Sequence, residues 1–170
     1  ENFGRQHSRN ITRGELGRYD RRKRWSRRLH VRGTLQIGLK MQKTSKISVV
    51  GAGRVGSAIV FALSKRGYQV VSVIDKNVKA ASRLAEKVHC KKFSYNPSDI
   101  NKDTELLFIT TPDDAIVKVV KEISLNKKLN FKKLIVAHTS GVHTSDPLKQ
   151  LKSKGATTFS FHPVQSFPKN

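Results

Sequence analysis

The sequence has little cysteine, methionine, tryptophan or acidic residue. Each of the first three occurs once in 170 residues, and Asp and Glu together occur 12 times. Because Cys90 has no second cysteine to pair with, an internal disulfide is excluded and a reducing compartment is expected. The apolar runs, such as residues 106–109, fall far short of the roughly 20 residues that a membrane-spanning helix needs. The sequence therefore predicts a cytoplasmic protein that makes no contact with a membrane and is too short for two large domains.

Several chemistries lack the residues that they require. The six histidines and Cys90 show no H-x-x-x-H or C-x-x-C spacing, so no metal site is expected. There is no G-x-S-x-G element and no G-x-x-x-x-G-K-[ST] loop. Hydrolases that use a G-x-S-x-G nucleophile and nucleoside triphosphatases that use a G-x-x-x-x-G-K-[ST] loop are therefore excluded.

The scarcity of acidic residues gives a formal net charge of +22, which two different parts of the chain produce. Residues 1–40 contain 12 basic residues, ten of them Arg, and 3 acidic ones. Residues 41–170 contain 22 basic residues, 19 of them Lys, and 9 acidic ones. Since the first segment has no apolar periodicity and is interrupted by glycines, we expect it to be disordered. The folded domain is expected over residues 41–170.

Four interpretations of residues 1–40 remain open from the sequence. Clustered arginines neutralise phosphates, which is typical of a nucleic-acid-binding arm. An Arg-rich, acid-poor leader also resembles an organelle transit peptide. A solvated tail is the third interpretation, and the fourth is that translation begins at Met41, which the change from Arg to Lys favours. The lysines after Met41 are not interleaved with aromatic residues, so they predict a solvated surface and no nucleic-acid partner.

From residue 46 onward, short apolar runs alternate with helix-like patterns. The runs, which predict strands, lie at residues 46–50, 69–74, 91–95, 106–110, 134–138 and 157–161. Between them, apolar residues recur at helical spacing, with Gly67 as a stop and Asn77 as an N-cap. Strands that are apolar throughout and separated by amphipathic helices are typical of a parallel sheet covered on both faces. The fold class predicted is therefore α/β, with a doubly wound, mostly parallel, Rossmann-like sheet.

The first predicted strand is followed by the element Gly51-Ala52-Gly53-Arg54-Val55-Gly56, which opens a predicted helix. In a G-x-G-x-x-G element, the first glycine permits a tight turn, the second lets the backbone approach a pyrophosphate, and the third allows close packing of helix and strand. The helix N-terminus favours an anion. The pattern indicates dinucleotide binding, although glycine turns also join strands to helices in proteins that bind nothing.

Asp75 stands at the end of the second predicted strand, 19 positions after Gly56. A carboxylate there accepts hydrogen bonds from the ribose hydroxyls of NAD and repels the 2′-phosphate of NADP. Lys76 and Lys79 follow closely and attract a phosphate, so NAD or NADP is expected, with NAD slightly favoured. The alternative role of Asp75 is to start the turn into Asn77.

The later strand ends supply further candidates. Thr111 and Pro112 follow the fourth strand and are expected to border the nicotinamide, whereas Asp113 is expected to cap the next helix. His138 and Ser140, at the end of the fifth strand, are candidates to supply a proton or hold a substrate oxygen. The structural alternative is that His138 only satisfies backbone groups. After the sixth strand, His162 is a candidate substrate contact.

Four of these motifs together resemble a known family. They are Val49-Val50-Gly51-Ala52-Gly53-Arg54-Val55-Gly56, Thr111-Pro112-Asp113-Asp114-Ala115-Ile116, His138-Thr139-Ser140-Gly141 and His162-Pro163-Val164-Gln165-Ser166-Phe167-Pro168. In this order they resemble the N-terminal half of a bacterial Rossmann-like family of oxidoreductases, similar to pyrroline-5-carboxylate reductases, ketopantoate reductases and deazaflavin-dependent NADP reductases. The resemblance implies an NAD(P)-binding half that is normally followed by a helical domain like that of 6-phosphogluconate dehydrogenase. It also implies a homodimer that forms through that second domain, which residues 1–170 do not include.

Two hypotheses of function follow. In the first, residues 41–170 bind NAD or NADP in an oxidoreductase that moves hydride to or from a small carbonyl, imine or alcohol, and the 170 residues alone bind only the cofactor. In the second, the domain is a dinucleotide-sensing or regulatory module without catalysis, and the basic arm contacts nucleic acid.

Overall fold

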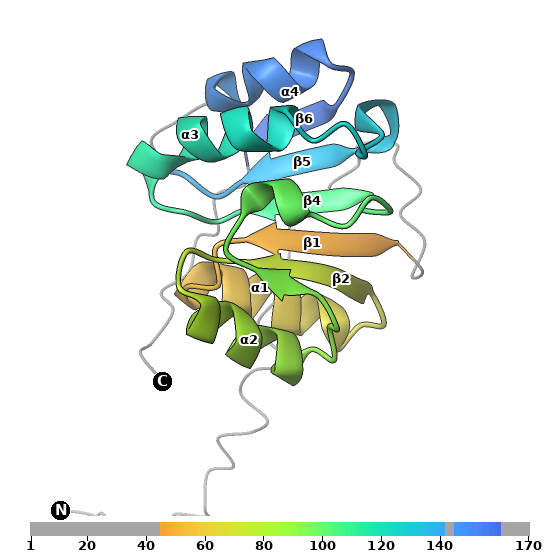
Figure 1. The fold of residues 1–170 in the computed structure, drawn as a ribbon, viewed down its shortest axis with the longest axis vertical. Helices are drawn as coiled ribbons and strands as arrows, with labels where there is room; N and C mark the ends of the chain where they lie inside the picture. The colour runs from red at the N-terminus through yellow and green to blue at the C-terminus, as the bar shows by residue number, and fades with distance from the viewer. Residues whose placement is uncertain (1–44, 142–144, 161–170) are drawn as a thin grey trace, which may run out of the picture. The chain divides into compact units, whose positions relative to one another are not determined.

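The computed structural model describes residues 45–141 and 145–160, in which six parallel strands form one sheet. They are β1 (Lys46–Val50), β2 (Gln69–Ile74), β3 (Phe93–Ser94), β4 (Leu106–Ile109), β5 (Ile135–His138) and β6 (Thr157–Ser160). Their order is β3-β2-β1-β4-β5-β6 (Figure 1). The chain winds outward from β1 to β3 and then outward from β4 to β6, so the winding direction changes between β1 and β4. The predicted doubly wound α/β fold is confirmed.

Helices connect the strands and cover both faces of the sheet. They are α1 (Arg54–Ser64), α2 (Val78–Lys87), α3 (Asp113–Ser124) and the short α4 (Lys149–Ser153), with 3₁₀ turns η2 (Pro97–Asp99), η3 (Phe131–Lys133) and η4 (Asp146–Leu148). Alternate residues of β4 belong to different cores: Leu106 and Phe108 to the cluster that includes residues of α1 and α2, Leu107 and Ile109 to the one that includes residues of α3 and α4. Burial on both faces explains why this strand is apolar throughout.

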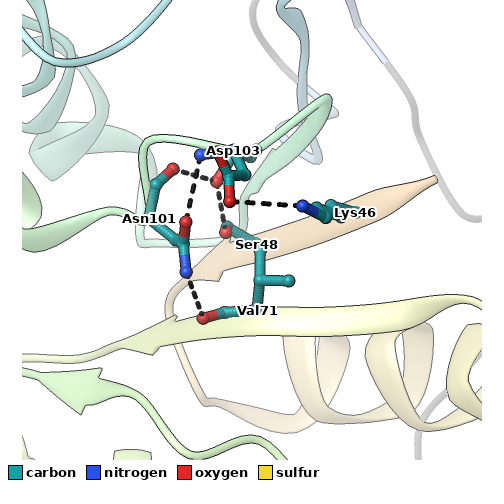
Figure 2. Close-up of polar contacts among 6 residues, drawn as sticks. Lys46, Ser48, Val71, Asn101 and Asp103 are labelled. Carbon is teal, nitrogen blue, oxygen red and sulfur yellow. Dashed lines mark hydrogen bonds and ion pairs between the residues drawn. The ribbon is translucent and has the colours of Figure 1, made fainter.

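A buried group of hydroxyls fixes the loop that precedes β4. The Ser48 Oγ of β1 lies 2.6 Å from Ser72 Oγ and 2.8 Å from Thr104 Oγ1. Asn101 donates its backbone N–H to Ser72 Oγ at 3.1 Å and its side-chain amide to the Val71 carbonyl at 3.4 Å, and Figure 2 shows it reaching β2 from the loop. These bonds satisfy polar groups that burial would otherwise leave costly. The start of β4 is thereby held against β1 and β2.

The predicted termini of the elements hold at some points and fail at others. Asn77 caps α2, since its Oδ1 accepts the Ala80 N–H at 3.2 Å, and Gly67 follows α1 with φ of 90°. The capping role expected of Asp113 is wrong: Pro112 is the N-cap of α3 and makes no side-chain cap bond, and Asp113 is the first helical residue. The proline ring fixes φ near the observed value of −53°, and with a ψ of 151° Pro112 has the non-helical backbone of an N-cap residue. Asp113 still places a carboxylate at the positive end of the helix dipole.

The third strand is shorter than the five residues expected. β3 comprises only Phe93 and Ser94, and it pairs with β2 alone at the edge of the sheet. The neighbouring Lys91, Lys92 and Tyr95 are exposed, and a short edge strand limits pairing with other chains. Among the described residues, no helix has both the length and the apolar character needed to cross a bilayer.

Candidate functional site

The glycine turn (residues 51–56) lies where the winding of the sheet changes direction. It leaves the carboxyl end of β1, while the next strand in the sheet, β4, ends alongside at Ile109 and is followed by Thr110. The Thr110 N–H donates to the Val50 carbonyl at 2.8 Å, which continues the pairing of the two strands by one residue. In doubly wound sheets, ligands bind at this point, outside the carboxyl ends of the strands. The sequence-predicted Thr111 and Pro112 follow directly after Thr110.

Gly51 is a glycine because the fold leaves no room for a side chain. Its φ of 108° lies in the region that L side chains rarely adopt. A Cβ would stand 2.7 Å from the Thr110 carbonyl carbon and 2.8 Å from the Thr110 Oγ1. The Gly51 N–H donates to the Ile74 carbonyl at 2.7 Å, so the turn is attached to the end of β2 as well.

Gly56 is also required by packing inside the protein. It is a buried residue of the first turn of α1, and a Cβ there would overlap the Gly51 carbonyl oxygen and the Thr110 hydroxyl. The helix therefore passes over the turn with no space for a methyl group, as the role of the third glycine predicted.

Gly53 differs from the other two glycines. Its φ is −70°, which any residue adopts, and a Cβ there would meet no atom of the described chain within 4 Å. The residue is exposed. Nothing in the packing of the described residues explains why a side chain is absent here, and the space in front of Gly53 is open.

The open space at Gly53 adjoins backbone amides that have no acceptor among the described residues. Gly53 is the N-cap of α1 and makes no side-chain cap bond, and the first helical N–H with a partner is that of Ser57, which donates to the Gly53 carbonyl at 2.9 Å. Arg54, Val55 and Gly56 therefore present the free N–H groups that begin every helix. With the positive end of the helix dipole, they form an arrangement that binds anions.

Asp75 follows β2 directly and lies against the glycine turn. Its Oδ2 accepts the Ala52 N–H at 2.6 Å, and its Oδ1 accepts the Asn77 N–H at 2.8 Å. The half-buried carboxylate thus supports the glycine turn and also starts the turn into Asn77, which is the alternative role considered from the sequence. Its contact with a ribose stays a prediction. A carboxylate has about four lone-pair sites, which leaves acceptor capacity for hydroxyl groups of a ligand. Lys76 and Lys79 are exposed beside it.

On the β4 side, Thr111 has a buried Oγ1 with no hydrogen-bond partner among the described residues. Pro112 is exposed at the start of α3. A buried hydroxyl without a partner is costly. The roles expected of Thr111 and Pro112 near a nicotinamide stay predictions.

His138 and Ser140 lie together at the end of β5, with little or no exposure. His138 is 0% exposed and pairs in register with Ile109 of β4 and Ser160 of β6. Its Nδ1 accepts the Ser140 N–H at 3.2 Å, so in the neutral ring the proton is assigned to Nε2. The histidine does satisfy a backbone group, as the structural alternative predicted, and whether it also contacts a substrate stays a prediction. His162 and residues 1–40 lie outside the described residues.

Sequence reasoning missed the hydroxyl that contacts the turn most closely. Thr110 Oγ1 donates to the Gly51 carbonyl at 2.7 Å, and Ser57 Oγ donates to the Ala52 carbonyl at 3.0 Å. Thr110 precedes the predicted Thr111 by one residue, and the signal that could have identified it is its position as the first residue after a buried central strand.

A cavity of about 310 Å³ lies away from this site, near the starts of β3 and β4, lined by residues that include Lys92, Asn101 and Lys128.

The sequence as a whole was compared with known families and proteins. The model of the Rossmann-like domain family matches residues 34–163. The chain belongs to this family. The match confirms that the chain carries a Rossmann-like domain, as the predicted resemblance implied. The similarity to pyrroline-5-carboxylate and ketopantoate reductases stays a prediction.

Solved structures share the fold at low sequence identity. A Bacteroides fragilis protein described as a putative NADP oxidoreductase is 21% identical, with a TM-score of 0.63, over 74% of this chain and 46% of that one. Prephenate dehydrogenase of A. aeolicus, solved with hydroxyphenyl propionate and NAD⁺, is 14% identical, with a TM-score of 0.60, over 74% and 43%. A shikimate 5-dehydrogenase of Mycobacterium fortuitum is 18% identical, with a TM-score of 0.56, over 68% and 44%.

Among curated proteins, a glutamyl-tRNA reductase of Prochlorococcus marinus is 28% identical in an alignment of 101 residues that covers 55% of this chain and 23% of that protein. The chain thus spans less than half the length of each of these four proteins.

Proposed function

We propose that this chain is the NAD(P)-binding domain of an oxidoreductase that transfers hydride to or from a small carbonyl, imine or alcohol. The observation that carries the proposal is the open space at Gly53, next to the free amides of α1. A pyrophosphate needs a backbone that it can approach and N–H groups that point at it, and this turn offers both. The fold shared with dehydrogenases supports the same proposal.

In this proposal each residue of the turn has a defined task toward the dinucleotide. The free amides of Arg54 and Val55 bind the pyrophosphate in the open space at Gly53, and Gly51, Ala52 and Gly56 give the turn its shape. Asp75 accepts hydrogen bonds from the adenosine ribose, because its two oxygens are held in place by backbone N–H groups and keep free lone pairs. A fixed carboxylate repels a 2′-phosphate, which favours NAD, whereas Lys76 lies close enough to reduce this preference.

The remaining tasks concern the reacting end. A bound nicotinamide supplies the hydride acceptor or donor. Thr111 and Pro112 border it from the end of β4, and the unpartnered Thr111 hydroxyl is available for a hydrogen bond there. We assign His138, Ser140 and His162 to the substrate side, where they would supply a proton or hold a substrate oxygen. A second, helical domain and a second copy of the protein complete the substrate pocket, and the protein acts in the cytoplasm.

The test of the proposal is to fill the open space. Gly53→Val in the 170-residue chain should remove binding of NAD⁺ and NADP⁺ in calorimetry, while circular dichroism and the melting temperature stay close to those of the unchanged chain. Gly67→Ala, at the other end of α1, is the matched control: its φ of 90° makes alanine strained, so stability should fall by about 1 kcal/mol and binding should persist. Equal affinity of Gly53→Val and the unchanged chain, or no binding by the unchanged chain, would contradict the proposal.

A further inference from the structure

We propose that Thr110 is a positioning residue for the dinucleotide site, in which its hydroxyl fixes the orientation of the peptide between Gly51 and Ala52. This inference rests on the proposed function. It assigns to Thr110, rather than to Thr111 alone, a role in binding at the end of β4.

The geometry around Thr110 is that of an anchor. Its backbone N–H is already engaged with the Val50 carbonyl at 2.8 Å, so the residue is fixed to β1. Its Oγ1 lies 2.7 Å from the Gly51 carbonyl oxygen and 3.3 Å from that of Val50. A hydroxyl has one proton, and 2.7 Å is the common length of an O–H···O hydrogen bond. The proton therefore goes to Gly51.

The Gly51 carbonyl and the Ala52 N–H belong to the same peptide group, which is planar and rigid. Thr110 of the β4 end holds the carbonyl side of this group, and Asp75 of the β2 end accepts the N–H at 2.6 Å. The peptide is thus fixed from both neighbours of β1 in the sheet. Fixing both ends of one plane defines its orientation.

Gly51 needs such an anchor because its own backbone does not define the turn. Glycine adopts positive and negative φ about equally, so without the Thr110 hydroxyl the orientation of the peptide that follows Gly51 depends on the bond from the Ala52 N–H to Asp75 alone. Rotation would take the Ala52 N–H away from Asp75. The carboxylate would lose the contact that holds Oδ2 in place, and the amides of Gly53 and Arg54 would shift with the turn. We therefore expect loss of the Thr110 hydroxyl to weaken dinucleotide binding.

Substitutions at Thr110 separate the hydroxyl from the shape of the side chain. Thr110→Val keeps the shape and removes the hydroxyl, whereas Thr110→Ser keeps the hydroxyl and removes the methyl group. The matched control is Thr158→Val on β6, because Thr158 Oγ1 is also buried but has no partner among the described residues.

The experiment measures two quantities on the 170-residue chain. Calorimetry with NAD⁺ and NADP⁺ should show that Thr110→Val binds about tenfold more weakly, the effect of one lost hydrogen bond, while Thr110→Ser and Thr158→Val bind as the unchanged chain does. Hydrogen exchange of the Ala52 amide, measured without ligand by NMR, should become about tenfold faster in Thr110→Val alone.

The outcomes separate this inference from the proposed function. Thr110→Val with unchanged affinity and unchanged Ala52 exchange would overturn the inference while the proposed function stands. Weaker binding that Thr110→Ser fails to restore would also overturn it, because the hydroxyl would then not be the cause. If the unchanged chain binds neither dinucleotide, the proposed function fails and the binding role of Thr110 fails with it, even where the Ala52 exchange responds as expected.

Discussion

Gly56→Ala tests how tightly α1 packs on the glycine turn. A Cβ at this position would overlap the Gly51 carbonyl oxygen and the Thr110 hydroxyl. Neither is the flexible end of a long side chain. The carbonyl belongs to the backbone of Gly51, which has a φ of 108°. The Gly51 N–H donates to the Ile74 carbonyl at 2.7 Å. The methyl group therefore has to displace α1, the turn or the Thr110 hydroxyl.

The size of the effect follows from opposing contributions. Overpacking of this kind costs about 1–3 kcal/mol. Displacing the Thr110 hydroxyl from the Gly51 carbonyl adds about 1 kcal/mol. Replacing glycine with alanine inside a helix returns about 1 kcal/mol. The net loss is about 2 kcal/mol, which for a domain of this size lowers the melting temperature by about 10 °C.

Urea unfolding followed by circular dichroism measures this loss. The control is Gly53→Ala, which adds the same methyl group where no atom of the described chain lies within 4 Å. Its free energy of unfolding should stay within about 1 kcal/mol of the unchanged chain, because alanine in place of a preferred N-cap typically costs about 1 kcal/mol and glycine already costs a few tenths of that. Equal stability of the two variants would refute the reasoning, since it would show that the contact at Gly56 is relieved at no cost.

Two further predictions concern Asp75 and Cys90. Asp75→Ser should weaken NAD⁺ binding relative to NADP⁺ in calorimetry, and an unaltered ratio would remove Asp75 from the ribose site. Burial raises the pKa of the Cys90 thiol above its ordinary value of 9.0, so the unfolded chain loses this proton at lower pH than the folded chain does. The stability that the neutral thiol contributes is therefore present below pH 9 and is lost as the pH rises above it. Cys90→Ala should show a smaller fall in unfolding free energy between pH 8 and 10 by urea titration, and an identical fall would contradict this cause.

The sequence predicted the elements whose burial is uniform. β1, β2 and β4 lie in the middle of the sheet, so most of their residues are apolar and their limits are visible to within one residue, as at Leu106–Ile109. The contact of Asp75 with the turn was also predictable, because the carboxyl ends of adjacent parallel strands meet at one edge. β3 was overestimated because an edge strand is defined by pairing on one side, which its composition does not report.

Which side chain at a strand end faces the turn could not be predicted. Thr110 and Thr111 are identical in type and adjacent in sequence, but only the first has its hydroxyl on the Gly51 carbonyl. The choice depends on the register of β4 against β1 and on where the strand ends, both of which are set by packing. The full burial of His138 has the same origin, since β4 and β6 pair with β5 on either side of it.

The N-caps of the first two helices show why the turn does more than join a strand to a helix. α2 begins with Asn77, whose side chain accepts the Ala80 N–H, so an amide of its first turn is satisfied by the protein itself. The N-cap of α1 is Gly53, which has no side chain to accept hydrogen bonds from the first amides of the helix. Glycine at this position costs a helix only a few tenths of a kcal/mol compared with Ser, Asn or Asp. A turn that merely connected β1 to α1 would need Gly51 and Gly56, because packing excludes a Cβ at both, but it would gain from a capping side chain at position 53. A glycine there leaves the first N–H groups of α1 to an acceptor from outside the described chain, which is the property that a diphosphate requires.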